Sequence, residues 1–208
     1  MYRAADPASS TPEEYRVPPS GPDERAVEQA VRTLIAAAGD DPDRQGLVDT
    51  PRRVRRAYRE WFAGYGVDPA TLLARRFDAE DYEGIVVLRG IKVVSTCEHH
   101  LAPIVGTAHV GYLPDGEVVG ISKLARLVDA FARRLQLQER LTRQVAQALD
   151  DALAPRGVGV VIEATHGCMS TRGVNAHGVS MVTECWLGAF KTDARLRDAL
   201  ARGTGAER

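Results

Sequence analysis

The sequence has few of the features that mark secreted, membrane or nucleic-acid-binding proteins. Its 208 residues include three cysteines, too few for a disulfide framework, which favours a reducing, cytoplasmic location. No apolar run approaches the ~20 residues of a membrane span, and the N-terminus lacks the basic and apolar regions of a secretory signal. Lys and Arg (27) balance Asp and Glu (28), so no net charge draws the chain to nucleic acid. We expect a cytoplasmic protein with no membrane or nucleic-acid partner.

The most informative stretch is Ser-Thr-Cys-Glu-His-His-Leu at residues 95–101. Its Cys97 and His100 form a Cys-x-x-His step, and Cys168 follows much later in His-Gly-Cys. Thiolates and imidazoles are ligands that Zn²⁺ prefers, and structural zinc sites close with four protein ligands. A set of two Cys and one His instead leaves one position for water. The pattern therefore favours a catalytic Zn²⁺, one per chain.

Two further histidines accompany these ligands. His99 and His166 each lie within two residues of a candidate ligand, where they could transfer protons beside a metal. The alternative is that the pattern is incidental, because buried cysteines often serve as small hydrophobes. His109 and His177 match no such role, and we expect both to be structural.

Composition and periodicity divide the chain into four parts. We expect a disordered arm over residues 1–22, an N-terminal helical segment over 23–84, a β-rich domain over 85–191, and a C-terminal helix and tail over 192–208. In the helical segment, Asp23 and Thr50 are expected caps, and Pro51 is expected at the first helical position of the second helix.

The β-rich part predicts an α+β fold with the order strand, strand, helix, helix, strand, strand. The expected strands are 85–94, with a bulge at Gly90, then 104–113, 158–165 and 179–190, with a short return at 117–121. Between the strand pairs, Ser122 is expected to cap the first of two amphipathic helices. A four-stranded antiparallel sheet built this way could bring the two groups of ligands together. It also leaves exposed edges, which favours a homo-oligomer.

Five arginines follow Pro51 on the second helix. The simplest interpretation is a solvated helix face, and the alternative is that one or two of them bind a polyphosphate. They are Arg52, Arg53, Arg55, Arg56 and Arg59.

Several motifs in the same order together resemble GTP cyclohydrolase I, with matching spacing from about Thr50 to Phe190. They are Ser-Thr-Cys-Glu-His-His-Leu from 95, Gly-Ile-Ser-Lys-Leu-Ala-Arg from 120, Gln-Leu-Gln-Glu-Arg-Leu-Thr from 136, His-Gly-Cys-Met from 166 and Arg-Gly-Val from 172. The resemblance implies a tunnelling fold, a toroidal homodecamer with active sites between subunits, and a catalytic zinc. The implied reaction opens the imidazole ring of GTP, releases C8 as formate, and rearranges and recloses the product to 7,8-dihydroneopterin triphosphate.

The resemblance also assigns roles to residues of this chain. Cys97, His100 and Cys168 match the zinc ligands, and His99 and His166 match the acid and base histidines. Glu139 matches the carboxylate that reads guanine, although an acid at a helix start also favours the helix dipole. The remaining matches to substrate contacts are Gln138 beside that carboxylate, Ser122 near the ribose and phosphate, and Lys123, Arg126, Arg172 and Arg53 at the triphosphate.

The chain departs from the family pattern after Arg172-Gly-Val, where residues 175–186 replace a lysine and a Ser/Thr-rich strand. Because all candidate ligands and proton donors are present, we expect ring opening. The departure leaves open whether the product serves tetrahydrofolate and one-carbon metabolism or another pterin or deazapurine route. The alternatives are a paralogue that stops at the ring-opened formamide or uses another guanine nucleotide, and a zinc-stabilised binding module without activity.

Overall fold

The computed structural model describes residues 23–201. Their contacts form two compact units, which divide between Gly66 and Val67. Residues 67–84, which we expected to be part of the helical segment, belong by their contacts to the second unit. The expected disordered arm of residues 1–22 and the last residues of the expected tail lie outside the described range. No helix within 23–201 has both the length and the apolar character needed to span a bilayer.

The first unit is a helical pair, α1 (Glu24–Ala37) and α2 (Thr50–Trp61), followed by the short 3-10 helix η2 (Ala63–Gly66). Asp49 occupies the N-cap position of α2, so the prediction that Thr50 is the cap was wrong by one residue. Arg55 joins the two helices, because its guanidinium lies 2.7 Å from Glu24 and 2.8 Å from Glu28. Part of the arginine face therefore stabilises the helical pair.

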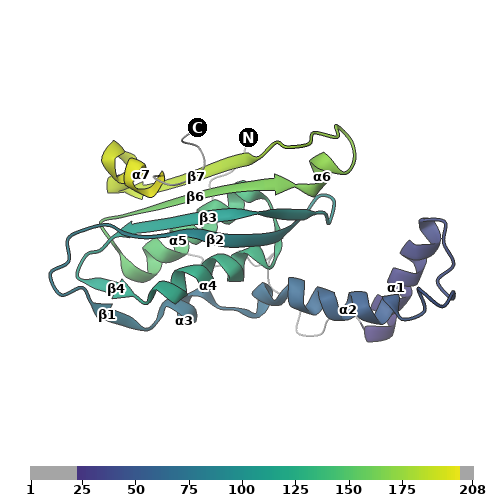
Figure 1. Ribbon diagram of the computed structural model, residues 1–208. Helices are drawn as coiled ribbons and strands as arrows, with labels where there is room; N and C mark the ends of the chain where they lie inside the picture. The colour runs from purple at the N-terminus through teal and green to yellow at the C-terminus, as the bar shows by residue number, and fades with distance from the viewer. Residues whose placement is uncertain (1–22, 202–208) are drawn as a thin grey trace, which may run out of the picture. The chain divides into compact units, whose positions relative to one another are not determined.

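The second unit has the predicted order of two strands, two helices and two strands, which is the order of the tunnelling fold (Figure 1). Its elements are α3 (Pro69–Leu73), β1 (Arg76–Asp78), β2 (Val86–Cys97), β3 (Pro103–Leu113), β4 (Glu117–Val119), α4 (Ile121–Ala132), β5 (Leu135–Gln136), α5 (Gln138–Leu153), β6 (Gly157–His166), α6 (Gly167–Ser170), β7 (Met181–Gly188), η3 (Ala189–Lys191) and α7 (Ala194–Ala201).

The four long strands form the antiparallel sheet predicted from the sequence, in the order β2-β3-β6-β7. The short strand β5 adds to the outer edge of β2, where it pairs in parallel with Thr96 and Cys97. The expected return strand is β4, which pairs with β1 in a separate two-stranded sheet. Strands β1 and β5, which were not expected, are three and two residues long, too short to show a period in the sequence.

Helices α4 and α5 cover one face of the sheet (Figure 1). Their predicted apolar positions, including Leu124, Leu127, Leu141 and Leu149, are fully buried against the inward residues of the strands. The opposite face is covered in part by α7, which buries Leu200. Ser122 does not cap α4, because Gly120 occupies the N-cap position and Ser122 lies exposed in the first turn.

The predicted bulge in β2 is present. The pairing with β3 shifts between Leu88 and Ile91, and Gly90 has the positive φ of 69° that favours glycine. The Gly90 N–H donates to Nδ1 of His109, at 3.4 Å. His109 is buried and takes part in this backbone contact, as expected of a structural histidine.

The topology explains how distant motifs meet. Strands β2 and β6 are both antiparallel to β3, so they run in the same direction and end at the same end of the sheet. Thr96 pairs with Pro103, and the next residue of β3, Ile104, pairs with His166. The sheet therefore brings the Cys97 turn beside the segment that carries His166 and Cys168.

Candidate metal and nucleotide site

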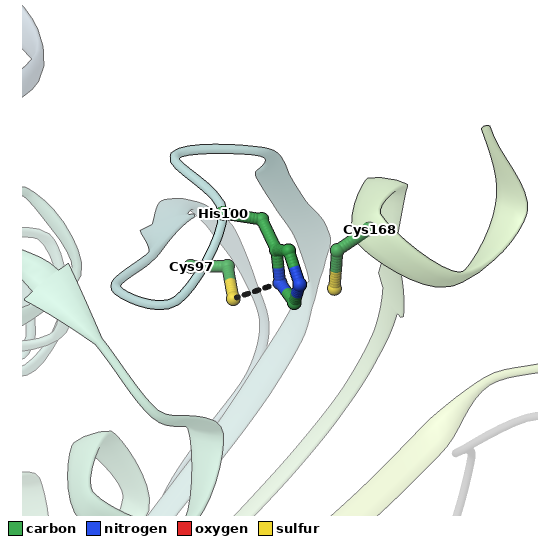
Figure 2. A group of neighbouring side chains, drawn as sticks. All are labelled: Cys97, His100 and Cys168. Carbon is green, nitrogen blue, oxygen red and sulfur yellow. Dashed lines mark hydrogen bonds between the residues drawn. The ribbon is translucent and has the colours of Figure 1, made fainter. Parts of the chain in front are cut away.

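The three candidate ligands converge at this end of the sheet (Figure 2). Cys97 ends β2, His100 lies in the turn that follows, and Cys168 lies in α6. Their ligand atoms are all within 4.8 Å of one another, and Sγ of Cys97 is 3.9 Å from Nδ1 of His100. Three elements thus place two sulfurs and one imidazole around a common point.

A tight turn brings His100 back towards Cys97. The Cys97 N–H donates to the carbonyl of Ala102 at 2.8 Å, and the Leu101 N–H donates to the carbonyl of Cys97 at 2.9 Å. Leu101 adopts a left-handed φ of 52°, a conformation that residues with a side chain rarely adopt outside such turns. These bonds hold the Cys-x-x-His step in the geometry of a chelating loop.

The chemistry of the donor set fits a zinc ion. Burial raises the pKa of the Cys168 thiol, the neighbouring Cys97 raises it further, and Arg172 opposes both effects. Two adjacent thiols resist ionising together, and a divalent cation supplies the charge that stabilises both thiolates. Within residues 23–201, the group of neighbouring Cys, His, Asp and Glu ligands consists of these three side chains. Three protein ligands leave a position open for water, as catalytic zinc sites do.

The two candidate proton-transfer histidines differ in how they are held. His166 is half-buried, and its Nε2 lies 2.8 Å from Oε1 of Gln138. Burial lowers the pKa of His166, while the nearby Glu139 carboxylate acts in the opposite direction. The side chain of His99 is 62% exposed, and its Nε2 lies 4.0 Å from a carboxylate oxygen of Glu98. His166 is therefore the more firmly placed of the two.

Helix α5 begins beside His166 and carries the two residues expected at the guanine. Glu139 is exposed in the first turn of the helix. Gln138 is 1% exposed, and its side chain is bonded within the protein. Arg172, expected at the triphosphate, is exposed and lies with Nη1 3.3 Å from Nε2 of His100. The three candidate ligands, His166, Glu139 and Arg172 thus gather at one end of the sheet.

The other expected phosphate contacts lie elsewhere. Ser122, Lys123 and Arg126 are in the first two turns of α4, whose far end leads into β5 beside Cys97. A helix of 12 residues is about 18 Å long, so the start of α4 lies near the opposite end of the sheet (Figure 1). Arg53 belongs to the first unit, where it lies 3.6 Å from Asp49. Within the second unit, Ser122, Lys123 and Arg126 therefore do not reach Cys97 of the same chain.

The sequence analysis did not identify an ion pair that holds the turn of residues 98–101, which follows Cys97 and carries His100. Glu98, inside the turn, pairs with Arg140 of α5, and both side chains are largely buried. Arg140 also donates to Oε1 of Gln136 at 3.1 Å, and the Glu98 N–H donates to the carbonyl of Gln136 at 3.1 Å. Both partners stand inside the quoted motifs, in Cys-Glu-His-His and Gln-Glu-Arg, which was the only signal in the sequence.

Comparisons with known proteins agree over most of the chain. The family described as GTP cyclohydrolase I matches residues 27–204. The GTP cyclohydrolase 1 of Hyphomonas neptunium is 56% identical over 178 residues, which cover 85% of this chain and 86% of that protein. That of Maricaulis maris is 53% identical over 182 residues, or 87% of this chain and 89% of its own. A solved archaeosine synthase QueF-like protein in the apo form covers 52% of this chain and 97% of its own, with 21% identity and a TM-score of 0.44.

Proposed function

The chain belongs to the GTP cyclohydrolase I family, and we propose that it is a zinc-dependent hydrolase that converts GTP to formate and 7,8-dihydroneopterin triphosphate. The observation that carries the proposal is the convergence of Cys97, His100 and Cys168 beside His166. Hydrolysis at a metal requires an open coordination position and a proton-transfer group held beside it. A structural zinc site requires neither of these features.

Cys97, His100 and Cys168 would hold the ion. When bound, zinc lowers the pKa of a water ligand towards ~7, which makes hydroxide available at neutral pH. Water adds at C8 of the purine, the bond from C8 to a ring nitrogen breaks, and that nitrogen takes up a proton. His166 or His99 supplies this proton, and His166 has the better-defined position. A second water then releases C8 as formate.

Glu139 would select guanine. Guanine presents N1–H and its 2-amino group side by side, so one carboxylate can accept from both, whereas adenine has an acceptor at N1. Once a bound base covers the carboxylate, an analogue that leaves it unpaired can be rejected by a factor of ~10⁴. The exposed position of Glu139 at the start of α5, near His166, supports this role.

We place the triphosphate between two copies of the chain. Arg172 stands at the metal end of one copy, and Ser122, Lys123 and Arg126 stand near the other end of the sheet. A neighbouring copy could supply that second group, with Arg53 as a further contact, and guanidinium and ammonium groups bind phosphates well. The edges of the described sheet, at β7 and along the part of β2 that β5 does not cover, favour such an assembly. We propose a homo-oligomer, of the decameric size that the family resemblance implies, working in the cytoplasm.

One assay separates this proposal from its alternatives. The protein is incubated with GTP, and formate is measured together with fluorescent pterin after oxidation. Formate with pterin supports the full reaction. An ultraviolet change without pterin indicates an enzyme that stops after ring opening. The divergent residues 175–186 would then account for the missing rearrangement. Bound zinc without any turnover indicates a binding module, and the proposal would then fail.

A further inference from the structure

Gln138 makes all its side-chain hydrogen bonds inside the protein. It is 1% exposed at the start of α5, and its Nε2 lies 3.0 Å from the carbonyl oxygen of Ile162 and 2.8 Å from that of Met181. Carbonyl oxygens only accept hydrogen bonds, so the atom that faces them must be the amide nitrogen. The orientation of the amide follows from its partners.

The contacts of two threonine hydroxyls agree with this orientation, which the two carbonyls already require. Thr142 donates to the backbone carbonyl of Gln138 at 2.8 Å, which uses its hydrogen. The hydroxyls of Thr142 and Thr183 are 2.6 Å apart, so Thr183 is the donor of that bond. The oxygen of Thr183 then accepts from Nε2 of Gln138, at 3.2 Å. The two hydrogens on Nε2 of Gln138 are thus shared among three acceptors, and reversing the amide would place Oε1 against two carbonyl oxygens.

The oxygen of this amide faces His166. Oε1 of Gln138 lies 2.8 Å from Nε2 of the imidazole, and an amide oxygen only accepts, so Nε2 must carry a hydrogen. In the neutral ring, Nδ1 is then bare. We propose that Gln138 is a positioning residue, which fixes the Nε2–H form of His166 and leaves Nδ1 to accept and return the proton during opening of the GTP ring.

This proposal rests on the proposed function for the role of His166, and it changes the role expected of Gln138. A direct contact with the nucleotide would need a free side-chain donor or acceptor, whereas both ends of this amide are engaged and the side chain is buried. The next residue, Glu139, is exposed and remains available to the base.

The hydrogen on His166 can be observed directly. Nitrogen NMR of the full chain with ¹⁵N-labelled histidine distinguishes the bare nitrogen from the N–H nitrogen of each ring, at about pH 8, where an ordinary imidazole is neutral. The chain has five histidines, and loss of one pair of signals in His166→Gln assigns the ring. We expect Nε2–H in the wild-type protein. A hydrogen on Nδ1 with a bare Nε2 would overturn the proposal without any variant at position 138.

Gln138→Met keeps the length of the side chain and removes the acceptor. We expect a mixture of the two neutral forms of His166, a kcat for GTP about 10- to 100-fold lower, and a KM within about twofold, as for other partners that orient a histidine. Thr183→Val is the matched control, because it removes a contact of Nε2 and leaves both carbonyls and Oε1 in place. It should keep the Nε2–H form and stay within about twofold of the wild-type kcat.

Other outcomes contradict the proposal. A Gln138→Met protein with unchanged kcat and an Nε2–H ring would show that Gln138 does not position His166. A raised KM with unchanged kcat would instead indicate a direct contact with the nucleotide. If the wild-type protein shows the Nε2–H ring but does not turn over GTP, the proposed function fails while the assignment of the hydrogen is upheld.

Discussion

Cys168 and His166 stand two residues apart, and their surroundings predict opposite results when each is replaced. Cys168 belongs to the ligand group, whereas His166 is bonded to Gln138. We expect Cys168→Ala to lose both metal and activity. We expect His166→Ala to keep its zinc while kcat falls ~10²- to 10⁴-fold, the usual contribution of a general acid or base. Metal analysis and formate release measure both effects.

Cys185→Ala provides the control for that pair of variants. Cys185 is half-buried on β7 and lies outside the ligand group, so its loss should leave zinc content unchanged. If His166→Ala also emptied the site, the division between ligands and proton donors would be wrong.

His109 predicts a dependence of stability on pH. Burial lowers the pKa of its imidazole below the ordinary 6.5, Arg89 lowers it further and Glu163 opposes them. The unfolded chain therefore binds more protons than the native one as the pH falls through 6.5 towards the native pKa. The free energy of unfolding should decrease over that range and be restored at higher pH. Urea unfolding of the zinc-loaded protein at several pH values measures it.

His109→Gln should reduce the slope of the free energy of unfolding against pH, because glutamine does not titrate. Its side-chain oxygen can still accept from the Gly90 N–H. Equal slopes in the two proteins would show that His109 does not contribute to the pH dependence of stability.

Side-chain chemistry could be predicted where it follows from local spacing. The step from Cys97 to His100 is contained in one turn, so the sequence could single out these two residues as candidate ligands. The role of Gln138 depends on carbonyls of β6 and β7 that are distant in the chain, and its burial could not be deduced from the motif. The same limit applies to Ser122, whose capping role was wrong because the chain begins its helix one residue after Gly120.

Among the elements, the turn between β2 and β3 depends on α5 for its position. Arg140 of α5 pairs with Glu98 in the turn, with 15% and 27% of the two side chains exposed. Arg140→Met keeps the apolar stem and removes this pair. We expect zinc affinity to fall about 10- to 100-fold, because the ligands are then less well oriented. Competition with a chromogenic chelator measures the affinity.

Arg143→Met is the matched control on the same helix. Arg143 is exposed and lies outside the ligand turn, so its replacement should leave zinc affinity unchanged. Equal affinities of the Arg140 and Arg143 variants would mean that the ion pair does not orient the ligands.

The long elements were predictable because their periods extend over many residues. The inward face of α4 has the expected burial, and the expected strand at β6 is buried along most of its length. The short strands β1 and β5 depend on a partner strand, so sequence periodicity could not identify them, whereas the return strand β4 was expected.

For the whole molecule, the proposed division of the substrate contacts between the two ends of the sheet predicts complementation between inactive chains. His166→Ala damages the metal end, and Arg126→Ala damages the start of α4. Each variant alone should have little activity. Random mixed oligomers should recover up to about a quarter of the wild-type activity, because that share of sites receives an intact half from each chain.

Co-expression with two affinity tags, followed by the formate assay, measures this recovery. Mixing His166→Ala with Cys168→Ala is the control, since both changes affect the same half and no site can be repaired. Recovery in the control, or none in the test pair, would contradict a site shared between copies.

The central claim is that the Cys97, His100 and Cys168 group holds the zinc on which opening of the GTP ring depends. Titration of zinc into metal-free protein, with formate release from GTP as the readout, tests it most directly. No formate is expected before zinc is added, and formate release should then rise linearly until one zinc is bound per chain. Undiminished formate release from the metal-free protein, or none from the fully loaded protein, would contradict it.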